Sequence, residues 1–382
     1  MATTTVNRCS GQVQPDGDVN GKRERSQLKA GDWIQVRTKE EIFATLDQNG
    51  ELDGMPFMPE MLAFCGKRFQ VYKRAHKTCD TVFPVRGRRL ERTVHLSTRC
   101  DGKSHGGCQA GCLLFWKEAW LRLAPTDEPV VDSAVPVRFF PGGLSTSLSS
   151  EADLGLRTMR QEADGPPAYV CQATRLPYAT SKLSWWDIRQ YIEDYVSGNV
   201  SAARLTAGFL FAAYHSLSEA GIGLGRPMRW LYDRLCPLWG GRPWPRKSGV
   251  IPIGGKTPEL QLNLQPGEIV RVKSLDEIMK TVTRDWKNRG MIWDPEMAPF
   301  CGNTYRVLRR VNQIIDEKTG KMIVMKNACI VLDSVVCEAR YNSCRMFCPR
   351  SIYPYWREVW LERVEAAQAQ ATEVGAGAAI QN

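Results

Sequence analysis

Cysteines are the residues of this chain with the clearest capacity for chemistry. The stretch CDGKSHGGCQAGC (100–112) places three of them and a histidine among glycines and small polar residues. Cysteines in such a setting can form a disulfide, act as a nucleophile or bind a metal ion. The choice among these roles depends on the compartment and on which cysteines belong together.

The N-terminus and the overall composition indicate the compartment. The 382-residue chain has 13 cysteines, a formal net charge of +10 and 43% hydrophobic residues. Residues 1–28 are polar, lack the apolar core of a secretory signal and are typical of a disordered arm. No run approaches the roughly 18 apolar residues of a membrane span. We therefore expect a cytoplasmic protein without membrane contact, in which reduced thiols favour metal ligation over disulfides.

Two parts of the chain resemble each other. GDWIQVRTKEEI (31–42) matches GEIVRVKSLDEI (267–278), and PFMPEMLAFCG (56–66) matches IWDPEMAPFCG (292–302), both 236 positions apart. FWKEAWLRL (115–123) matches YWREVWLERV (355–364) at an offset of 240. Spacing, residue type and order agree, so the sequence predicts two copies of one module on either side of a different middle segment.

The same offset relates four cysteines of each module. The predicted sets are Cys65, Cys100, Cys108 and Cys112, and Cys301, Cys337, Cys344 and Cys348, with Cys337 one place out of register. Four thiolates suit tetrahedral Zn²⁺ in a structural site, so we predict two zinc ions per chain. An iron–sulfur cluster and a set of buried, inert cysteines are the alternatives. Tyr341 takes the place of His105 in the second module, which favours a solvated loop histidine over a ligand.

The expected elements of each module are mainly strands. An alternating apolar–polar run after a glycine predicts strands at 31–37 and 267–273. Short helices are predicted at EEIFATL and DEIMKTV, and further strands at RFQVYKRA, TYRVLRRVNQII, RTVHL and CIVLD. Turns are predicted at PVRGRR (84–89) and DEKTGK (316–321). The aromatic residues Trp116, Trp120, Trp356 and Trp360 are assigned to the core.

Two resemblances follow from these segments. A five-stranded curled sheet with this opening strand, the CG…V of mid-module and the closing WL…V resembles an SH3-like barrel of the KOW type. By HGGCQAGCLLFWKEAWL and FCPRSIYPYWRE, the whole chain resembles an uncharacterised family of duplicated bacterial cysteine-rich proteins. That resemblance implies a bacterial, cytoplasmic protein and carries no activity.

The middle of the chain is expected to be helical. A strand is predicted at VCQATRLP (170–177), and helices at 184–199, 201–221 and 226–239, the first capped by Ser184. Trp185 and Trp186, beside Tyr191, are assigned to packing at the helix start in preference to partner binding. The predicted fold class is mainly β with a helical middle, in which two tandem SH3-like barrels are joined by an α-helical hairpin. Its parts are a disordered arm (1–28), module 1 (29–124), a linker (125–165), the helical segment (166–262), module 2 (263–364) and a disordered tail (365–382).

Function is expected to reside in surfaces. The sequence offers no recognisable nucleophile–base–orienter set, and coordination by four cysteines leaves no open position on a metal. Residues 67–99 hold ten Lys and Arg against two acidic residues, and the candidate polyanion contacts are Lys67, Arg68, Lys73, Arg74, Arg86, Arg88 and Arg89. We predict a non-catalytic, metal-stabilised tandem barrel that binds nucleic acid or an acidic protein. The alternative is an enzyme, accessory factor or scaffold of a bacterial biosynthetic pathway, with a substrate cleft between barrels and helices formed by Asp187, Arg189, Arg350 and Tyr353.

Overall fold

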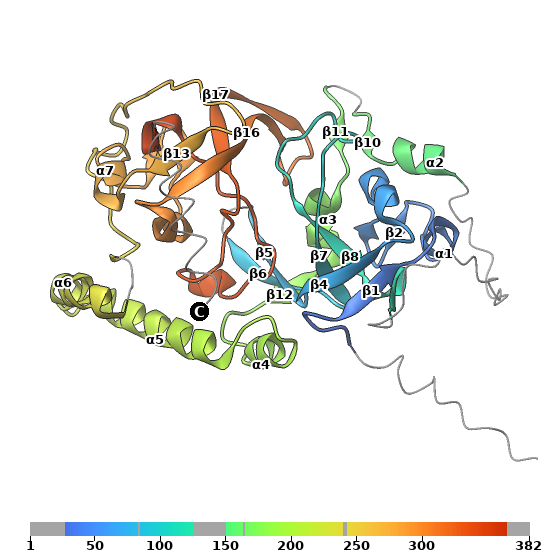
Figure 1. The fold of residues 1–382 in the computed structure, drawn as a ribbon, viewed down its shortest axis with the longest axis horizontal. Coiled ribbons are helices and arrows are strands. Elements are labelled where there is room, and N and C mark those ends of the chain that lie inside the picture. The colour runs from blue at the N-terminus through green and yellow to red at the C-terminus, as the bar shows by residue number, and fades with distance from the viewer. Residues whose placement is uncertain (1–26, 83–84, 125–149, 163–164, 240–242, 365–382) are drawn as a thin grey trace, which may run out of the picture.

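The computed structural model describes residues 27–82, 85–124, 150–162, 165–239 and 243–364. Nearly all of the predicted arm, most of the predicted linker and the predicted tail lie outside these ranges. Two curled antiparallel sheets stand side by side, with a smaller sheet between them and helices along one edge (Figure 1). None of the helices in the described ranges has both the length and the apolar character needed to cross a membrane.

The first module is built on a five-stranded sheet of order β8-β7-β4-β1-β9. Its strands are β1 (Trp33–Val36), β4 (Arg68–Arg74), β7 (Thr93–Arg99), β8 (Leu113–Lys117) and β9 (Leu121–Leu123). Ile34 lies opposite Phe69 on one side and Leu123 on the other. Helix α1 (Lys39–Phe43) begins at Thr38, which forms a capping box with Glu41.

The second module repeats this arrangement with four strands in the order β17-β16-β13-β18. These are β13 (Ile269–Val272), β16 (Thr304–Ile315), β17 (Met322–Leu332) and β18 (Leu361–Arg363). Val270, 236 positions after Ile34, lies opposite Tyr305 and Arg363. Helix α7 (Leu275–Met279) has a capping box between Ser274 and Glu277. The strands and short helices predicted at the start of both modules are therefore confirmed.

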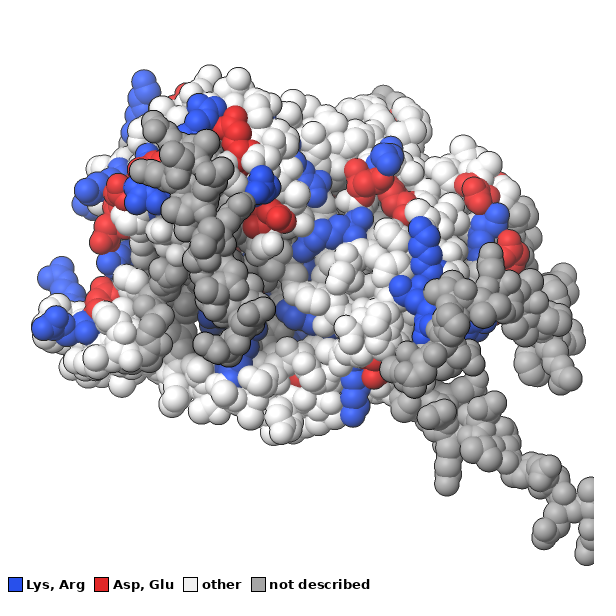
Figure 2. Space-filling model, in the orientation of Figure 1, with Lys and Arg blue, Asp and Glu red and all other residues white. Residues whose placement is uncertain are grey.

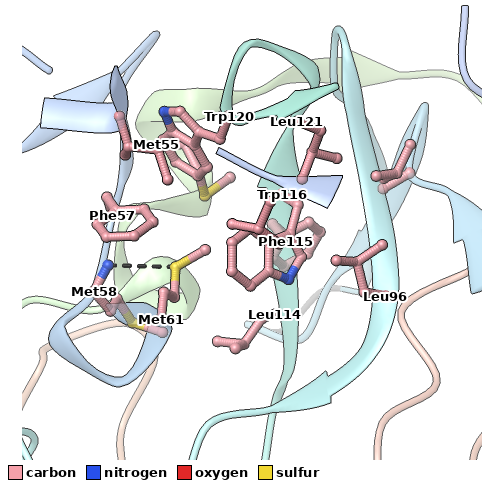
Figure 3. Close-up of a cluster of buried hydrophobic side chains, with 14 of the residues drawn as sticks. Met55, Phe57, Met58, Met61, Leu96, Leu114, Phe115, Trp116, Trp120 and Leu121 are labelled. Carbon is pink, nitrogen blue, oxygen red and sulfur yellow. Dashed lines mark hydrogen bonds between the residues drawn. The ribbon is translucent and has the colours of Figure 1, made fainter. Parts of the chain in front are cut away.

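The core of the first module contains a group of packed aromatic rings among aliphatic side chains (Figure 3). Phe57 packs edge-on against Trp116 and Trp120, with ring centroids 6.3 and 5.3 Å apart. Trp120 is fully buried, and its indole N–H donates to Thr45 Oγ1 at 3.1 Å. A buried indole is thus hydrogen-bonded as well as packed, which fixes the closing strand against the helical turn after α1.

The core of the second module has the same construction. Trp293 packs edge-on against Trp356 and Trp360, with ring centroids 5.9 and 5.3 Å apart. The indole N–H of Trp360 donates to Thr281 Oγ1 at 2.8 Å, and 281 is 236 positions after the first module's threonine. All four tryptophans assigned to the core are fully buried, so that prediction is confirmed.

A third sheet fills the space between the modules. It has the order β12-β6-β5 and consists of β5 (Lys77–Asp80), β6 (Arg86–Arg89) and β12 (Ser181–Leu183). The prediction of a turn at 84–89 is wrong for 86–89, which form β6. Gly87 is needed there for close approach, because a Cβ would lie 3.1 Å from Leu183 O and 3.3 Å from Cys344 O.

Helices replace two segments that were predicted otherwise. The segment predicted as a strand at 170–177 instead forms helix α3 (Gln172–Ala179). The Gln172 side chain accepts the backbone N–H of Phe115 and donates to the carbonyl oxygen of Phe115, both at 2.8 Å. The predicted linker contains α2 (Glu151–Leu156), capped by Ser150 and anchored in the first core by Leu154. In both segments, tertiary contacts at the edge of the first sheet favour a helix over the predicted structure.

Three helices run along one edge of the molecule (Figure 1). They are α4 (Arg189–Val196), α5 (Ala202–Ser218) and α6 (Gly225–Leu235). Helix α4 starts five residues later than predicted. Trp185 and Trp186 precede it with 57% and 69% of their surface exposed, so the prediction that they pack at the helix start is wrong.

Short elements complete the described fold. The two-stranded sheets are β2 (Glu51–Leu52) with β3 (Met55–Pro56), β10 (Met159–Arg160) with β11 (Ala168–Tyr169), and β14 (Lys287–Asn288) with β15 (Met291–Ile292). The 3-10 helices are η1 (Pro59–Phe64), η2 (Glu118–Trp120), η3 (Cys236–Trp239), η4 (Pro295–Phe300), η5 (Ser343–Arg345) and η6 (Glu358–Trp360).

Candidate metal centre and binding surfaces

The loop 100–112, between β7 and β8, is folded tightly on itself. The backbone N–H of Cys100 donates to Cys112 O at 2.9 Å, which closes the loop at its base. Gly102 has a φ of +71°, and a Cβ there would lie 2.0 Å from Cys108 O. Only glycine fits at this position, because both the left-handed backbone and the close approach exclude a side chain.

Four thiols line one small cavity inside this loop. The cavity has a volume of about 30 Å³, and the thiols belong to Cys100, Cys108, Cys112 and Cys171. Burial raises the pKa of Cys112 to about 12 and that of Cys171 to about 11. Cys171 caps the start of α3 and has no partner at the 236-residue offset, which is why the sequence comparison missed it.

A second group of cysteines lies where β5 meets the loop 337–348. Cys79, Cys337 and Cys348 belong to one buried cluster. Burial opposes ionisation of Cys348, but a hydrogen bond from the Cys79 thiol and one from the Arg350 backbone lower its pKa to about 7. The Cys79 pKa is raised well above its usual value, chiefly by the same hydrogen bond. Cys344 is exposed in η5, which packs against β5 and β6.

The remaining two predicted zinc ligands lie elsewhere in the modules. Cys65 follows η1, packs against the first core and does not line the thiol cavity. Cys301 follows η4 in the second core, 4.0 Å from Met297 O. Within the described ranges, no three sulfurs of either predicted set lie within 4.8 Å of one another. The two predicted zinc sets, and iron–sulfur as their alternative, stay predictions.

Glu60, Cys100 and His105 form the only group of three potential ligand atoms this close together in the described part of the chain. His105 is 1% exposed, so the prediction of a solvated histidine is wrong. Its Nδ1 lies 2.7 Å from Glu60 Oε1 and its Nε2 lies 3.1 Å from Val170 O. Both ring nitrogens are used in hydrogen bonds, which indicates that the group holds the loop in place.

The second module supports this structural role. Glu296, the counterpart of Glu60, is 4% exposed and accepts the backbone N–H groups of Arg340 and Tyr341, both at 2.7 Å. These residues correspond to 104 and 105 in the first module. Burial raises the pKa of Glu296. A buried glutamate thus clamps the cysteine loop of each module, with or without a histidine.

Three of the seven candidate polyanion contacts, Arg74, Arg88 and Arg89, form ion pairs within the protein. Arg74 is buried between Glu118 and Glu193, at 2.7 and 3.2 Å. Arg88 lies 3.4 Å from Asp80, and Arg89 lies 3.4 Å from Glu193. Lys67 and Arg86 are exposed, whereas Arg68 and Lys73 are half-buried. Basic and acidic side chains are interspersed on the face drawn in Figure 2.

The four residues predicted to form a cleft are not gathered into one. Arg189 pairs with Asp187 at 2.7 Å on the surface, and its hydrogen bond lowers the Asp187 pKa to about 2. Arg350 is buried and bonds Cys79 O at 3.2 Å and Glu317 at 2.8 Å. The guanidinium group of Arg99 lies over the Tyr353 ring, 3.9 Å from the ring centroid.

A cleft of about 860 Å³ lies instead between α5, α6 and the second module. Its wall residues are mostly aromatic or aliphatic and include Leu210, Phe211, Tyr214, Leu231, Leu235, Phe300 and Phe347. Its charged groups are Arg204, Glu338 and Arg340, and Arg204 donates to Glu338 O at 3.1 Å. A cleft between helices and a module was predicted, but from other residues.

Comparison of the chain with family models, curated proteins and solved structures finds no match.

Proposed function

We propose that this protein is a non-catalytic binding protein, and that an apolar, acidic segment of a partner protein docks in the cleft between α5, α6 and the second module. The observation that carries the proposal is the exposure of α5. Only Ser218 of its 17 residues is buried, although Arg204 is its only formally charged residue. A helix that is apolar on most sides is normally covered.

The exposed apolar surface extends beyond α5. We define the α5–α6 surface by Phe209, Leu210, Leu217, Leu224, Trp230, Leu231, Leu235 and Leu238, each at least 37% exposed. The edge of the molecule along α5 carries few charged side chains in Figure 2. Exposed apolar side chains gathered on two neighbouring helices are typical of a protein interface, where tryptophans often contribute much of the binding energy.

The charge around the cleft favours an acidic partner. Helix α6 contains Arg226, Arg229 and Arg234 against Asp233. Arg229 pairs with Glu219, whereas Arg226 and Arg234 have no ion-pair partner within the described ranges. Carboxylates of a docked segment would neutralise these guanidinium groups and increase the rate of association.

The fold proposal is that both modules are copies of one duplicated SH3-like barrel. Its support is the recurrence of strand register, capping boxes and tryptophan hydrogen bonds at offsets of 236 and 240 residues. In this account the modules form a rigid frame, and the helical segment between them supplies the docking surface.

Capture of partners from the source cells tests the proposed function. A tagged full-length chain is compared with a Leu210→Asp/Leu231→Asp variant and with a matched control, Val324→Asp, which changes an exposed apolar residue on β17. We expect one acidic protein to be retained by the wild type and the control and lost from the cleft variant. Arg226→Glu/Arg234→Glu should weaken its capture most at low salt, and the difference from the wild type should shrink as the salt concentration rises, because salt screens charge interactions.

Three outcomes would count against the proposal. Equal capture by all variants would exclude the cleft, and co-sedimentation with anionic lipid vesicles that is lost in the cleft variant would assign the surface to a membrane. Binding to RNA or DNA at about 100 mM salt, unaffected by the cleft variant, would favour the nucleic-acid alternative.

One observation favours the second candidate function, an enzyme or accessory factor of a biosynthetic pathway. The cleft volume lies within the range of roughly 300–1,000 Å³ common for small-molecule sites. Turnover of a small molecule that is lost in Leu210→Asp/Leu231→Asp and kept in Val324→Asp would establish it.

A further inference from the structure

We propose that the chain holds two zinc ions in sites that each combine a three-cysteine loop with one cysteine from outside that loop. The first site consists of Cys100, Cys108, Cys112 and Cys171, and the second of Cys79, Cys337, Cys344 and Cys348. The matched residues Cys65 and Cys301 are not ligands in this assignment. The proposal is independent of the docking function.

The first site is defined by the thiol cavity. Its four cysteines line a space of about 30 Å³, which is enough for a single ion. The backbone N–H of Ile315 points to Cys108 Sγ at 3.4 Å. Such a hydrogen bond stabilises a sulfur that carries negative charge, as a metal-bound thiolate does.

The second site has the same composition at the interface of the two modules. Cys79 and Cys348 are buried in one cluster, and Cys337 packs against them. Cys79 and Gly87 are paired in the β5–β6 ladder. The Cys79 side chain therefore projects from the face of the sheet on which a Cβ at position 87 would lie. That direction leads to Cys344, whose carbonyl lies 3.3 Å from the Gly87 Cβ position.

Two arginines without carboxylate partners among the described residues lie beside the first site. The guanidinium groups of Arg99 and Arg309 lie 3.9 and 5.7 Å from the Tyr353 ring centroid, next to the loop 100–112. Arg99 donates to Gly111 O and Ser351 O, both at 2.9 Å, and neither arginine has a carboxylate partner among the described residues. Half-buried cations normally have an anionic partner.

A zinc ion with four thiolates supplies that negative charge. Its net charge of −2 would be balanced at the first site by Arg99 and Arg309. Arg350 lines the thiol cavity and also donates to Cys79 O at 3.2 Å, so its buried guanidinium lies between the two sites. The two arginines beside the first site are thus explained by an anionic centre there, whereas Arg350 is already paired with Glu317.

Ligation would contract both sets. No three of these sulfurs lie within 4.8 Å of one another, whereas four sulfurs on one zinc ion lie about 4 Å apart. The cysteines that would have to move belong mostly to the loop 100–112 and to η5 and its neighbours, which lie outside the strands of the sheets.

Metal analysis of the full-length protein, purified without chelators, tests the ligand sets. We expect two zinc ions per chain in the wild type and one in each of Cys171→Ser and Cys79→Ser. The matched controls Cys65→Ser and Cys301→Ser should retain two. Loss of zinc from the controls but not from the other two variants, iron in place of zinc, or a wild type without metal would overturn the proposal.

A second measurement requires no variant, so it does not depend on whether one folds. Cys344 is exposed and should react readily with iodoacetamide unless a metal occupies its thiolate. We expect peptide mass spectrometry to find Cys344 protected in the purified wild type and alkylated at least tenfold faster after treatment with a zinc chelator. Equal rates before and after chelation would contradict metal binding at Cys344.

Discussion

Arg74 and Glu118 form an ion pair at the edge of the first core, and Arg310 and Glu358 form its counterpart in the second. The N–O distances are 2.7 and 2.6 Å. Glu118 also accepts the backbone N–H of Leu28, and Arg74 donates to the carbonyl of the same residue. Each pair therefore fastens the segment before a module's first strand to the turn before its last strand.

Neutralising either carboxylate should destabilise the protein. We expect Glu118→Gln and Glu358→Gln each to lower the free energy of unfolding by about 3 kcal/mol, because a largely buried arginine loses an ionic partner. Glu362→Gln is the matched control, since its pair with Arg271 is exposed and should contribute less than about 0.5 kcal/mol. Urea denaturation measures all three, and equal effects in the three variants would show that burial of the pairs is unimportant.

Glu358 also predicts a pH dependence. Burial alone would raise its pKa, but the Leu264 N–H and the Arg310 guanidinium hold it below the ordinary value of 4.5. Because the folded pKa is the lower one, this carboxylate stabilises the fold fully above its unfolded pKa, and the contribution is lost as the pH falls through the folded pKa. Below about pH 4.5 the unfolding free energy of the wild type should fall more steeply than that of Glu358→Gln. Parallel pH profiles would contradict this assignment.

Lys77 links three parts of the chain in a buried position. Its ammonium donates to Asp194 Oδ2 at 2.6 Å on α4 and to Met346 O at 2.9 Å in the second module. Lys77→Met should cost about 3–5 kcal/mol, because it leaves a fully buried carboxylate without its lysine. Lys77→Met/Asp194→Leu should recover much of this loss in the same denaturation assay. A double variant as unstable as the sum of both single variants would argue against a coupled pair.

The sequence predicted the structure where a local pattern of residues determines it. The alternation of β1 and β13, the capping boxes after them and the four tryptophans all predicted the observed module starts and cores. The sequence was insufficient where the local structure depends on a contact with residues far away in the chain. Gly87 looked like a turn residue until Leu183 and Cys344 were seen to approach it.

The cysteines show the same limit. Comparison of the two modules identified the loop cysteines by their repetition, but Cys79 and Cys171, which share a cluster or a cavity with them, are not repeated. Conversely, Cys65 and Cys301 match in sequence, but Cys65 packs against the first core and Cys301 belongs to the second. An internal repeat identifies residues that occupy equivalent positions in the two modules. A site at an interface can also include residues that have no equivalent in the other module.

The basic residues of β6 should differ in their effect on stability. Arg86 is exposed, so Arg86→Glu should change the unfolding free energy by less than about 0.5 kcal/mol. Arg88→Glu should lower it by about 2 kcal/mol, because Arg88 donates to Pro177 O and pairs with Asp80. Thermal unfolding compares the two. Equal melting temperatures would indicate that the contacts of Arg88 do not support the fold.

Removal of metal should loosen α5. The aromatic residues Tyr341 and Phe347 lie in the same loop as Cys344 and Cys348, and they pack against Phe211 and Gly208 of α5. After chelation, hydrogen exchange of the amides at 202–218 should accelerate, while exchange in β1 of the first module stays unchanged. Equal amide exchange rates in α5 before and after chelation would show that metal binding in the cysteine loop does not affect the docking surface.

The most direct test of the docking function is a photo-crosslink from position 210. A photoreactive phenylalanine analogue replaces Leu210 in the full-length chain made in its source cells, and Val324 carries the same analogue in the control. We predict an adduct with one acidic partner protein from position 210, none from position 324, and loss of the adduct when Leu231→Asp is added. A crosslink from position 210 only to a second copy, or only to another segment of the same chain, would contradict docking of a partner in this cleft.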